Sequence, residues 1–136
     1  FAEKLRSKEL KVRNLVDPEV YVRVDYNMFE TVMRNLLSNA IKFTPRGGEI
    51  TLSAKEGKET TEVVLKDTGI GIDPIHLRKL FAIDTVFSRA GTEGEKGTGF
   101  GLVLCKDFIR ANGGTIRVSS EPGVGSVFSL FLPKPS

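Results

Sequence analysis

The sequence has little of several features that would assign a protein class at once. Of its 136 residues, one is a cysteine, Cys105, and one is a histidine, His76. A single cysteine excludes an internal disulfide, and its apolar helical setting predicts a buried thiol in a reducing compartment. The longest apolar runs are only a few residues, so we expect neither a membrane-spanning helix nor a signal peptide.

The charge pattern also excludes a class. The net charge is +3, and the basic residues are scattered from Lys4 to Lys134 without a stripe interleaved with aromatics. This pattern argues against nucleic-acid binding. With 40% hydrophobic and 27% charged residues, the chain reads as one soluble globular domain with a proper core. We expect residues 1–10 to be the end of a linker or preceding helix, and residues 11–136 to form the domain.

The order of apolar and turn-forming residues predicts a mixed α/β architecture. Strands are expected at 11–16, 20–24, 49–55, 61–66, 115–119 and 126–132, and helices at 25–43, 73–81 and 99–111. Residues of about 82–98 are polar and glycine-containing, which is typical of a mobile functional lid. The expected fold is a two-layer α/β sandwich, a mixed sheet with about three helices on one face.

The helix expected at 25–43 carries a polar row beside its apolar stripe. Asn35, Asn39 and Lys42 are spaced at i, i+4 and i+7, so they share one edge of the helix. Asn is a poor residue inside helices, but amide oxygens suit Mg²⁺ and a nearby ammonium suits phosphate. Taken alone, the row fits either a magnesium and phosphate site or two amides bound to neighbouring backbone.

An Asp-Gly turn, DTGIG at 67–71, follows the strand expected at 61–66. The carboxylate of Asp67 can accept a hydrogen bond from adenine N6, while Gly69 and Gly71 let a flat base approach. Guanine would present a carbonyl oxygen instead, and an unsatisfied charged partner costs ~1–3 kcal/mol, so adenine should be preferred by roughly tenfold or more. The alternative is a plain turn.

A glycine-rich stretch, GEKGTGFG at 94–101, runs into the helix expected at 99–111. Backbone N–H groups at such a helix start can bind an anion, and the helix dipole favours negative charge there. Lys96 and Arg89 would supply mobile counter-charges. A P-loop or a dinucleotide-binding turn would need a different spacing after a strand. A flexible loop is the alternative interpretation.

In this order, the three motifs resemble the nucleotide-binding domain of sensor histidine kinases, within the GHKL group that includes gyrase, Hsp90 and MutL. The matching stretches are NLLSNAIKFTP (35–45), DTGIGI (67–72), the phenylalanine-bearing segment 80–87, GTGFGL (97–102) and GGTIRVSSEPGVGSVFSLFLP (113–133). The resemblance covers nearly the whole chain. It implies a Bergerat-type sandwich that binds ATP and Mg²⁺ between the asparagine-bearing helix and the lid.

The resemblance also implies roles for single residues. Asn39, with Asn35, would hold Mg²⁺, and these two with Lys42, which meets phosphate, would be the catalytic set. Asp67 would bind adenine. The other nucleotide contacts would come from ring, turn and glycine-loop residues: Phe43, Gly69, Gly71, Ile72, Lys96, Gly97, Thr98, Gly99, Phe100, Gly101 and Leu102.

The sequence departs from the family pattern at a few positions. Phe43 stands where many relatives have Tyr, and Phe100 where Leu is common. Asn112 replaces a His that often precedes the Gly-Gly pair, a change at a helix end that we expect to be harmless.

One position separates a kinase from a hydrolase. Hydrolysing members carry a Glu four residues before the metal-binding Asn, and here that position is Asn35, which cannot take a proton. Transfer to a neutral imidazole needs no such base. His76 lacks the flanking Glu and Pro of a phospho-acceptor, so we expect the acceptor on a separate domain.

The resemblance therefore implies the ATP-binding catalytic domain of a two-component sensor histidine kinase, with little activity in isolation. The implied partners are its own dimerisation domain, which carries the phospho-acceptor histidine, and a response regulator. The parent is expected to be a homodimer with this domain in the cytoplasm, without nucleic-acid or membrane contact by the domain. Two alternatives stay open: an anti-sigma-factor-type serine kinase, which would need a Glu at position 35 or another base near the γ-phosphate, and a non-catalytic nucleotide-sensing module.

Overall fold

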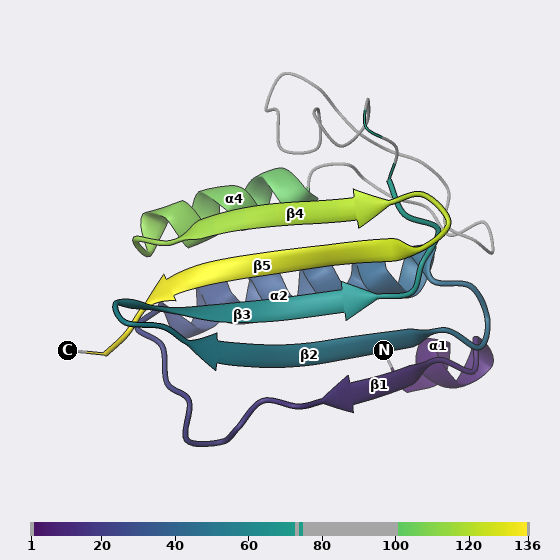
Figure 1. Cartoon of the computed structure of the whole chain (residues 1–136), viewed down its shortest axis with the longest axis horizontal. Coiled ribbons are helices and arrows are strands. Elements are labelled where there is room, and N and C mark those ends of the chain that lie inside the picture. Colours follow the sequence, from purple (N-terminus) through teal and green to yellow (C-terminus); the bar gives the residue numbers. More distant parts are fainter. Residues whose placement is uncertain (1, 73, 75–100, 136) are drawn as a thin grey trace.

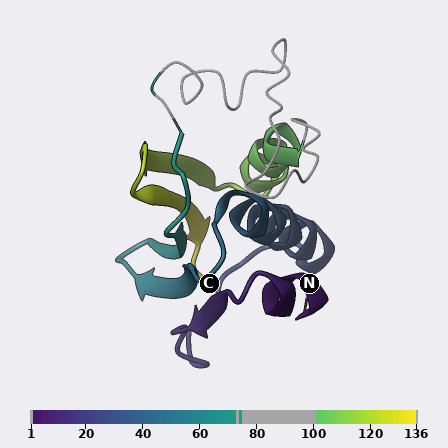
Figure 2. The same cartoon turned by 90° about the vertical axis from the view of Figure 1, so that its right-hand side faces the viewer.

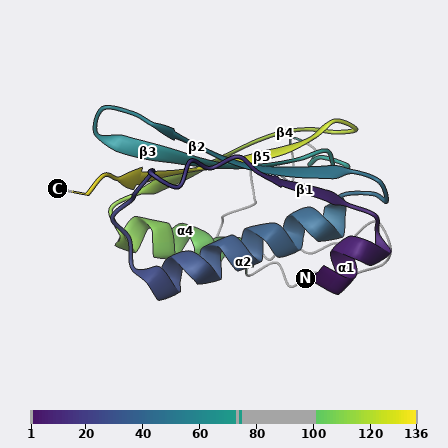
Figure 3. The same cartoon turned by 90° about the horizontal axis from the view of Figure 1, so that it is seen from below.

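The computed structural model describes residues 2–72, 74 and 101–135, in which helices and a sheet form two layers (Figure 1). The strands are β1 (Lys11–Asn14), β2 (Glu49–Glu56), β3 (Thr60–Asp67), β4 (Thr115–Glu121) and β5 (Gly125–Pro133), and the helices are α1 (Ala2–Ser7), α2 (Tyr26–Phe43) and α4 (Gly101–Ala111). These helices all lie on the same face of the sheet (Figure 3). The predicted mixed α/β sandwich is confirmed.

The sheet has the strand order β1-β2-β3-β5-β4. β1 pairs with β2 in parallel, and every other neighbouring pair is antiparallel. The predicted hairpins β2–β3 and β4–β5 are therefore confirmed. Because β5 inserts beside β3, the end of β3 lies next to the start of β5, with Asp67 paired to Ser126. This junction brings together residues that are far apart in sequence.

Helix α2 begins and ends where its sequence predicts. Asp25 is the N-cap, and its Oδ1 accepts a hydrogen bond from Met28 N at 2.9 Å. The apolar stripe faces the sheet, with Val32, Leu36 and Ala40 buried in the core. In the end-on view, α2 and α4 lie side by side against the sheet (Figure 2).

Helix α4 runs antiparallel to α2. Its apolar residues Leu102, Cys105 and Ile109 are buried, as the helical spacing predicts. Cys105 donates weakly from Sγ to the carbonyl of Val32 at 3.7 Å, and burial raises the pKa of this thiol to about 12. The cysteine is a core residue, as expected.

The strand predicted at Val20–Val24 is wrong. This segment belongs to no strand, although Arg23 N donates to Pro133 O at 2.8 Å. Val22 and Val24 pack against the core while Tyr21 and Arg23 are exposed. The alternation of apolar residues therefore reports burial of alternate side chains rather than ladder pairing, since the segment crosses from β1 to the start of α2 (Figure 1).

Helix α1 occupies part of the stretch expected to be a linker or preceding helix. It lies near the C-terminal end of α2 (Figure 3), and Leu5 and Leu10 pack against the core. The domain boundary at residue 11 stays a prediction. In the described part of the chain, no helix combines the length and the apolar character needed to cross a membrane.

Candidate functional site

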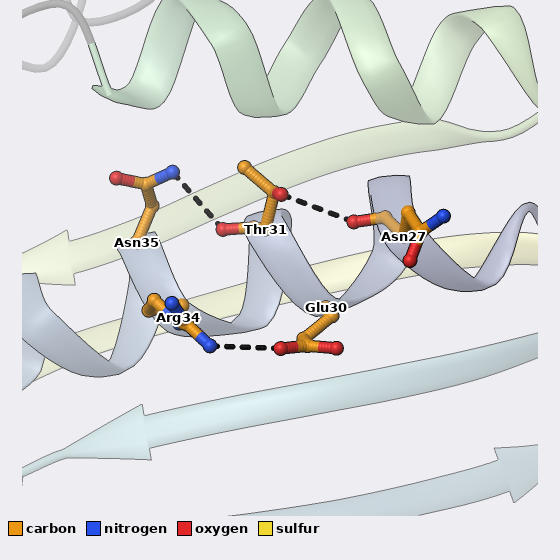
Figure 4. A network of polar contacts seen from close by, with 5 residues as sticks. All are labelled: Asn27, Glu30, Thr31, Arg34 and Asn35. Carbon is orange, nitrogen blue, oxygen red and sulfur yellow. Dashed lines mark hydrogen bonds and ion pairs between the residues drawn. The ribbon is translucent and has the colours of Figure 1, made fainter.

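Asn35, the first residue of the polar row of α2, lies on the edge of the helix that faces α4 in Figure 4, away from the ion pair of Glu30 and Arg34. Asn35 is half-buried, and its Nδ2 donates to Thr31 O at 3.0 Å. Its Oδ1 makes no hydrogen bond to any described residue. The alternative that the amide is bound to neighbouring backbone is thus correct for its nitrogen, while its oxygen remains available as a ligand.

Asn39 and Lys42 continue this row toward the end of α2. Both are half-buried. Within the described residues, the side chain of Asn39 has no hydrogen-bond partner, which is costly for a half-buried amide unless water or a ligand binds it. No cluster of three or more His, Cys, Asp or Glu that could hold a metal occurs in the described ranges. In the polar row of α2, the amide oxygens of Asn35 and Asn39 are therefore the groups that could bind a hard cation.

Asp67, at the end of β3, is 6% exposed and is held by two backbone groups. Its Oδ1 accepts from Gly69 N at 2.8 Å and from Ser126 N at 3.3 Å. Burial raises the pKa of this carboxyl, and the two hydrogen bonds oppose that rise. Its Oδ2 binds no described residue, so the carboxylate is fixed in orientation with one acceptor oxygen left over.

The turn after Asp67 packs between the end of α2 and the β4–β5 hairpin. Ile70 N donates to Phe43 O at 2.9 Å, and Ile72 N donates to Ser120 Oγ at 2.8 Å. A Cβ on Gly69 would lie 2.4 Å from Phe43 O, so only glycine allows this close approach. The C-terminal end of α2, next to the last residue of the polar row, is thus in direct contact with the Asp-Gly turn.

Gly71 gives a test of this packing. Its φ is +75° and an added Cβ would lie 2.2 Å from Glu121 O, whereas Gly47 has φ +83° with open space around it. We expect Gly71→Ala to lower the free energy of unfolding by roughly 2–4 kcal/mol, because it adds a backbone clash to left-handed strain. The matched control Gly47→Ala should lose only ~1 kcal/mol. Urea unfolding of both variants measures the difference, and equal losses would contradict the close approach at Gly71.

The start of α4 lies beside the middle of α2, at the level of Asn35. Asn112 contacts Asp25 and Met28 near the start of α2, and Cys105 contacts Val32. One further turn back along α4 leads to Gly101, at the level of Leu36 on α2. The N-terminal end of α4 therefore lies beside Asn35, where the polar row begins, and Asn39 and Lys42 lie beyond it toward the end of α2.

Several predicted residues are outside the described part of the chain. They are Lys96, Gly97, Thr98, Gly99 and Phe100 of the glycine-rich stretch, together with Arg89, His76, the helix expected at 73–81 and the lid at about 82–98. Of the remaining predicted contacts, Ile72 and Leu102 are buried in the core, and Phe43 is half-buried at the end of α2.

Two residues beside the site were not singled out from the sequence. Ser126 supplies a backbone N–H to Asp67 from 59 residues away, and Gly125 leaves only 2.1 Å between a would-be Cβ and Asp67 O. The sequence does predict that a strand starts after the Pro122-Gly123 turn. It does not predict that this strand pairs with β3, because the pairing depends on distant parts of the chain.

Asn112, expected to be a harmless departure, connects the two long helices. Its Oδ1 accepts from Asp25 N at 2.8 Å and its Nδ2 donates to Phe108 O at 2.7 Å. It therefore fastens the C-terminal end of α4 to the N-cap of α2.

Comparison with known proteins agrees with this arrangement. Residues 24–136 match the family model described as histidine kinase-, DNA gyrase B- and HSP90-like ATPase. Sensor protein SrrB of Staphylococcus aureus is 40% identical over 111 residues, which cover 82% of this chain and 19% of SrrB. The chain thus spans about a fifth of the length of the curated relatives that it matches.

Solved structures show the same fold. The nucleotide-free catalytic domain of histidine kinase ThkA has a TM-score of 0.81 at 29% identity, covering 98% of this chain and 85% of that one. ThkA in complex with response regulator protein TrrA has a TM-score of 0.78 at 26% identity, covering 99% and 37%. Full-length ShkA in complex with AMPPNP has a TM-score of 0.78 at 25% identity, covering 96% and 27%.

The family model covers far more than half of the chain, and these histidine kinases share its fold over nearly all of it. The chain therefore belongs to the family of histidine kinase-, DNA gyrase B- and HSP90-like ATPases, as an ATP-binding catalytic domain of the sensor histidine kinase type.

Proposed function

We propose that residues 11–136 bind ATP with Mg²⁺ and position its γ-phosphate for transfer to a histidine on a separate dimerisation domain. The observation that carries this proposal is the geometry of Asp67. One of its oxygens is held by Gly69 N and Ser126 N, and the other binds no described residue. A buried carboxylate with one fixed, unused acceptor suits the exocyclic amine of adenine.

The remaining residues have complementary roles. Phe43, Gly69, Gly71 and Ile72 line the base, because the Asp-Gly turn packs against the end of α2. Lys42 and residues 96–102 meet the phosphates, as the helix dipole favours at the start of α4.

The amides of Asn39 and Asn35 hold Mg²⁺. Two observations support this role. Among the described residues, the Oδ1 of Asn35 accepts no hydrogen bond, and the side chain of Asn39 has no hydrogen-bond partner. Mg²⁺ supplies charge neutralisation at the phosphate oxygens when it is bound.

Catalysis in this domain rests on positioning and electrostatics rather than on a general base. Asn35 cannot accept a proton, and its nitrogen is already used by Thr31 O. Water is therefore not activated at this position, whereas a neutral imidazole offers its own lone pair. ATP is held with little hydrolysis until the acceptor histidine arrives.

The relatives' names support the wider setting of this proposal. SrrB is a sensor protein, and a ThkA structure contains a response regulator. We accordingly assign the parent protein a dimerisation domain with the acceptor histidine, a response regulator as the next phosphate acceptor, a homodimeric state and a cytoplasmic location for this domain.

Calorimetry followed by phosphotransfer tests the proposal. The chain is titrated with ATP and with GTP in the presence of Mg²⁺, and then mixed with a separately purified acceptor domain and γ-labelled ATP. We expect ATP to bind at least about tenfold more tightly than GTP, and label to appear on histidine only when the acceptor domain is present. No ATP uptake would refute the binding site.

The phosphotransfer step also discriminates the alternatives. Label on serine would favour a serine kinase, and ATP binding without transfer would favour a nucleotide-sensing module. Robust labelling of the isolated chain would contradict the separate acceptor.

A further inference from the structure

Lys8, between α1 and β1, is the one lysine that is fully buried among the described residues, with 0% of its surface exposed. Its Nζ donates to Ile41 O at 2.8 Å and to Lys42 O at 3.2 Å. Both carbonyls belong to the last turn of α2, where helical carbonyls lack intrahelical donors and the dipole favours a cation. The buried ammonium is thus compensated by the end of a helix.

Pro45 explains why an external donor is needed there. In a continuing helix, the carbonyl of Ile41 would accept from the N–H of residue 45, four positions later. Proline has no N–H, so this donor does not exist. Lys8 replaces it from a segment 33 residues earlier in the chain.

The same segment is bound to the loop that follows α2. Arg46 Nη1 donates to Ser7 O at 2.7 Å, and Gly47 N donates to Lys8 O at 2.9 Å. Lys11 N donates to Gly48 O at 3.0 Å. Residues 7–11 and 45–48 are therefore held together by hydrogen bonds.

The other side of this helix end holds the Asp-Gly turn. The carbonyl of Phe43 accepts from Ile70 N, and Gly69 has no room for a Cβ beside it. Consecutive carbonyls at the end of α2 thus bind Lys8 on one side and the turn of Asp67 on the other. Lys8 and the turn of Asp67 are therefore both bound to the same helix end.

We propose that Lys8 is a positioning residue for the nucleotide site, which couples the placement of the segment before β1 to the affinity for ATP. The proposal rests on the proposed function, because it takes the turn of Asp67 and the end of α2 to be the nucleotide site. Lys8 itself contacts no nucleotide. It acts by holding the last turn of α2 in the geometry that binds.

The test compares two variants that weaken opposite ends of α2. Lys8→Met keeps the length of the side chain and removes its donors, whereas Asn112→Ala removes the contact at the N-cap of α2, away from the site. Both should lose stability in urea unfolding without ligand. In calorimetry with ATP and Mg²⁺, we expect Lys8→Met to bind about tenfold more weakly or worse, and Asn112→Ala to bind like the wild type.

A conservative variant and a charge control complete the design. Lys8→Arg, which keeps a cationic donor, should recover part of the lost affinity, and Lys55→Met on the exposed end of β2 should change nothing. Lys8→Gln, which retains a donor on a shorter side chain, takes the place of Lys8→Met if the latter does not fold, with the same expected direction.

A folded Lys8→Met or Lys8→Gln variant with wild-type affinity would overturn the proposal, and so would equal losses of affinity in Lys8→Met and Asn112→Ala. Neither result would touch the proposed function, which is tested separately by ATP binding and phosphotransfer with the wild-type chain.

Discussion

Replacement of Asp67 by Asn is expected to weaken ATP binding by about 100-fold while the fold persists. The carbonyl oxygen of Asn can keep the hydrogen bonds from Gly69 N and Ser126 N. Its NH₂ group then stands where Oδ2 was and meets the amine of adenine donor to donor. Calorimetry with ATP and Mg²⁺ measures the loss, and Asp107→Asn on the exposed face of α4 is the control.

Base preference sharpens this prediction. Guanine presents a carbonyl oxygen where adenine presents an amine, so the NH₂ group of Asp67→Asn can donate to it. We expect the ratio of GTP affinity to ATP affinity to rise by at least about tenfold in the variant. An unchanged ratio would show that Asp67 does not contact the base.

Although Asp67→Asn should weaken ATP binding, it should not lower the stability of the fold. Burial raises the pKa of Asp67, so the folded state favours the protonated carboxyl. The stability that this group contributes is fully present below its unfolded pKa and is lost as pH rises through its folded pKa. At neutral pH the ionised carboxylate is a cost, and Asp67→Asn should unfold at an equal or higher urea concentration than the wild type.

The pH dependence of binding follows from the same shift. ATP affinity should fall as pH decreases through the raised pKa of Asp67, because the protonated carboxyl loses acceptor strength. The fall should begin at a higher pH than an ordinary aspartate would give, and it should be absent in Asp67→Asn. A wild-type affinity with the same pH dependence as that of Asp67→Asn would contradict this assignment.

Local signals were sufficient to predict α2 and both hairpins. Asp25, the apolar spacing of Val32, Leu36 and Ala40, and Pro45 all act within a few residues, so the helix limits could be predicted from the sequence. The identity of Asp67 as a strand-end carboxylate was also predictable. Its orientation was not, because the donor Ser126 N reaches it only through the pairing of β3 with β5.

Long-range contacts account for what the sequence did not reveal. A lysine before a short strand is normally solvated, and nothing near Lys8 indicates that its partners are carbonyls at the end of α2. The Val20–Val24 alternation predicted a strand because burial of alternate residues looks the same with or without a neighbouring strand. Both cases depend on how distant segments pack rather than on local propensity.

Asn39→Ala is expected to remove the Mg²⁺-dependent part of ATP binding, with an affinity loss of about 10- to 100-fold in Mg²⁺. In the described structure the Asn39 side chain has no hydrogen-bond partner to lose, and Ala is the better helix former by roughly 0.5 kcal/mol. The free energy of unfolding should therefore stay equal or rise while function is lost. If Asn39 instead served packing, Asn39→Ala would lower the free energy of unfolding and leave the ATP affinity unchanged.

Removing the metal tests whether the affinity loss in Asn39→Ala comes from Mg²⁺ binding. With EDTA present, wild type and Asn39→Ala should bind ATP equally weakly, because neither then uses the amide as a ligand. Asn27→Ala is the control, since Asn27 is an exposed asparagine in the first turn of the same helix (Figure 4), far from Asn39. It should bind ATP like the wild type in both buffers. If wild-type binding does not respond to EDTA, or Asn39→Ala keeps its full response, the amide row is not the metal site and Lys42 and Asp67 must hold the nucleotide without it.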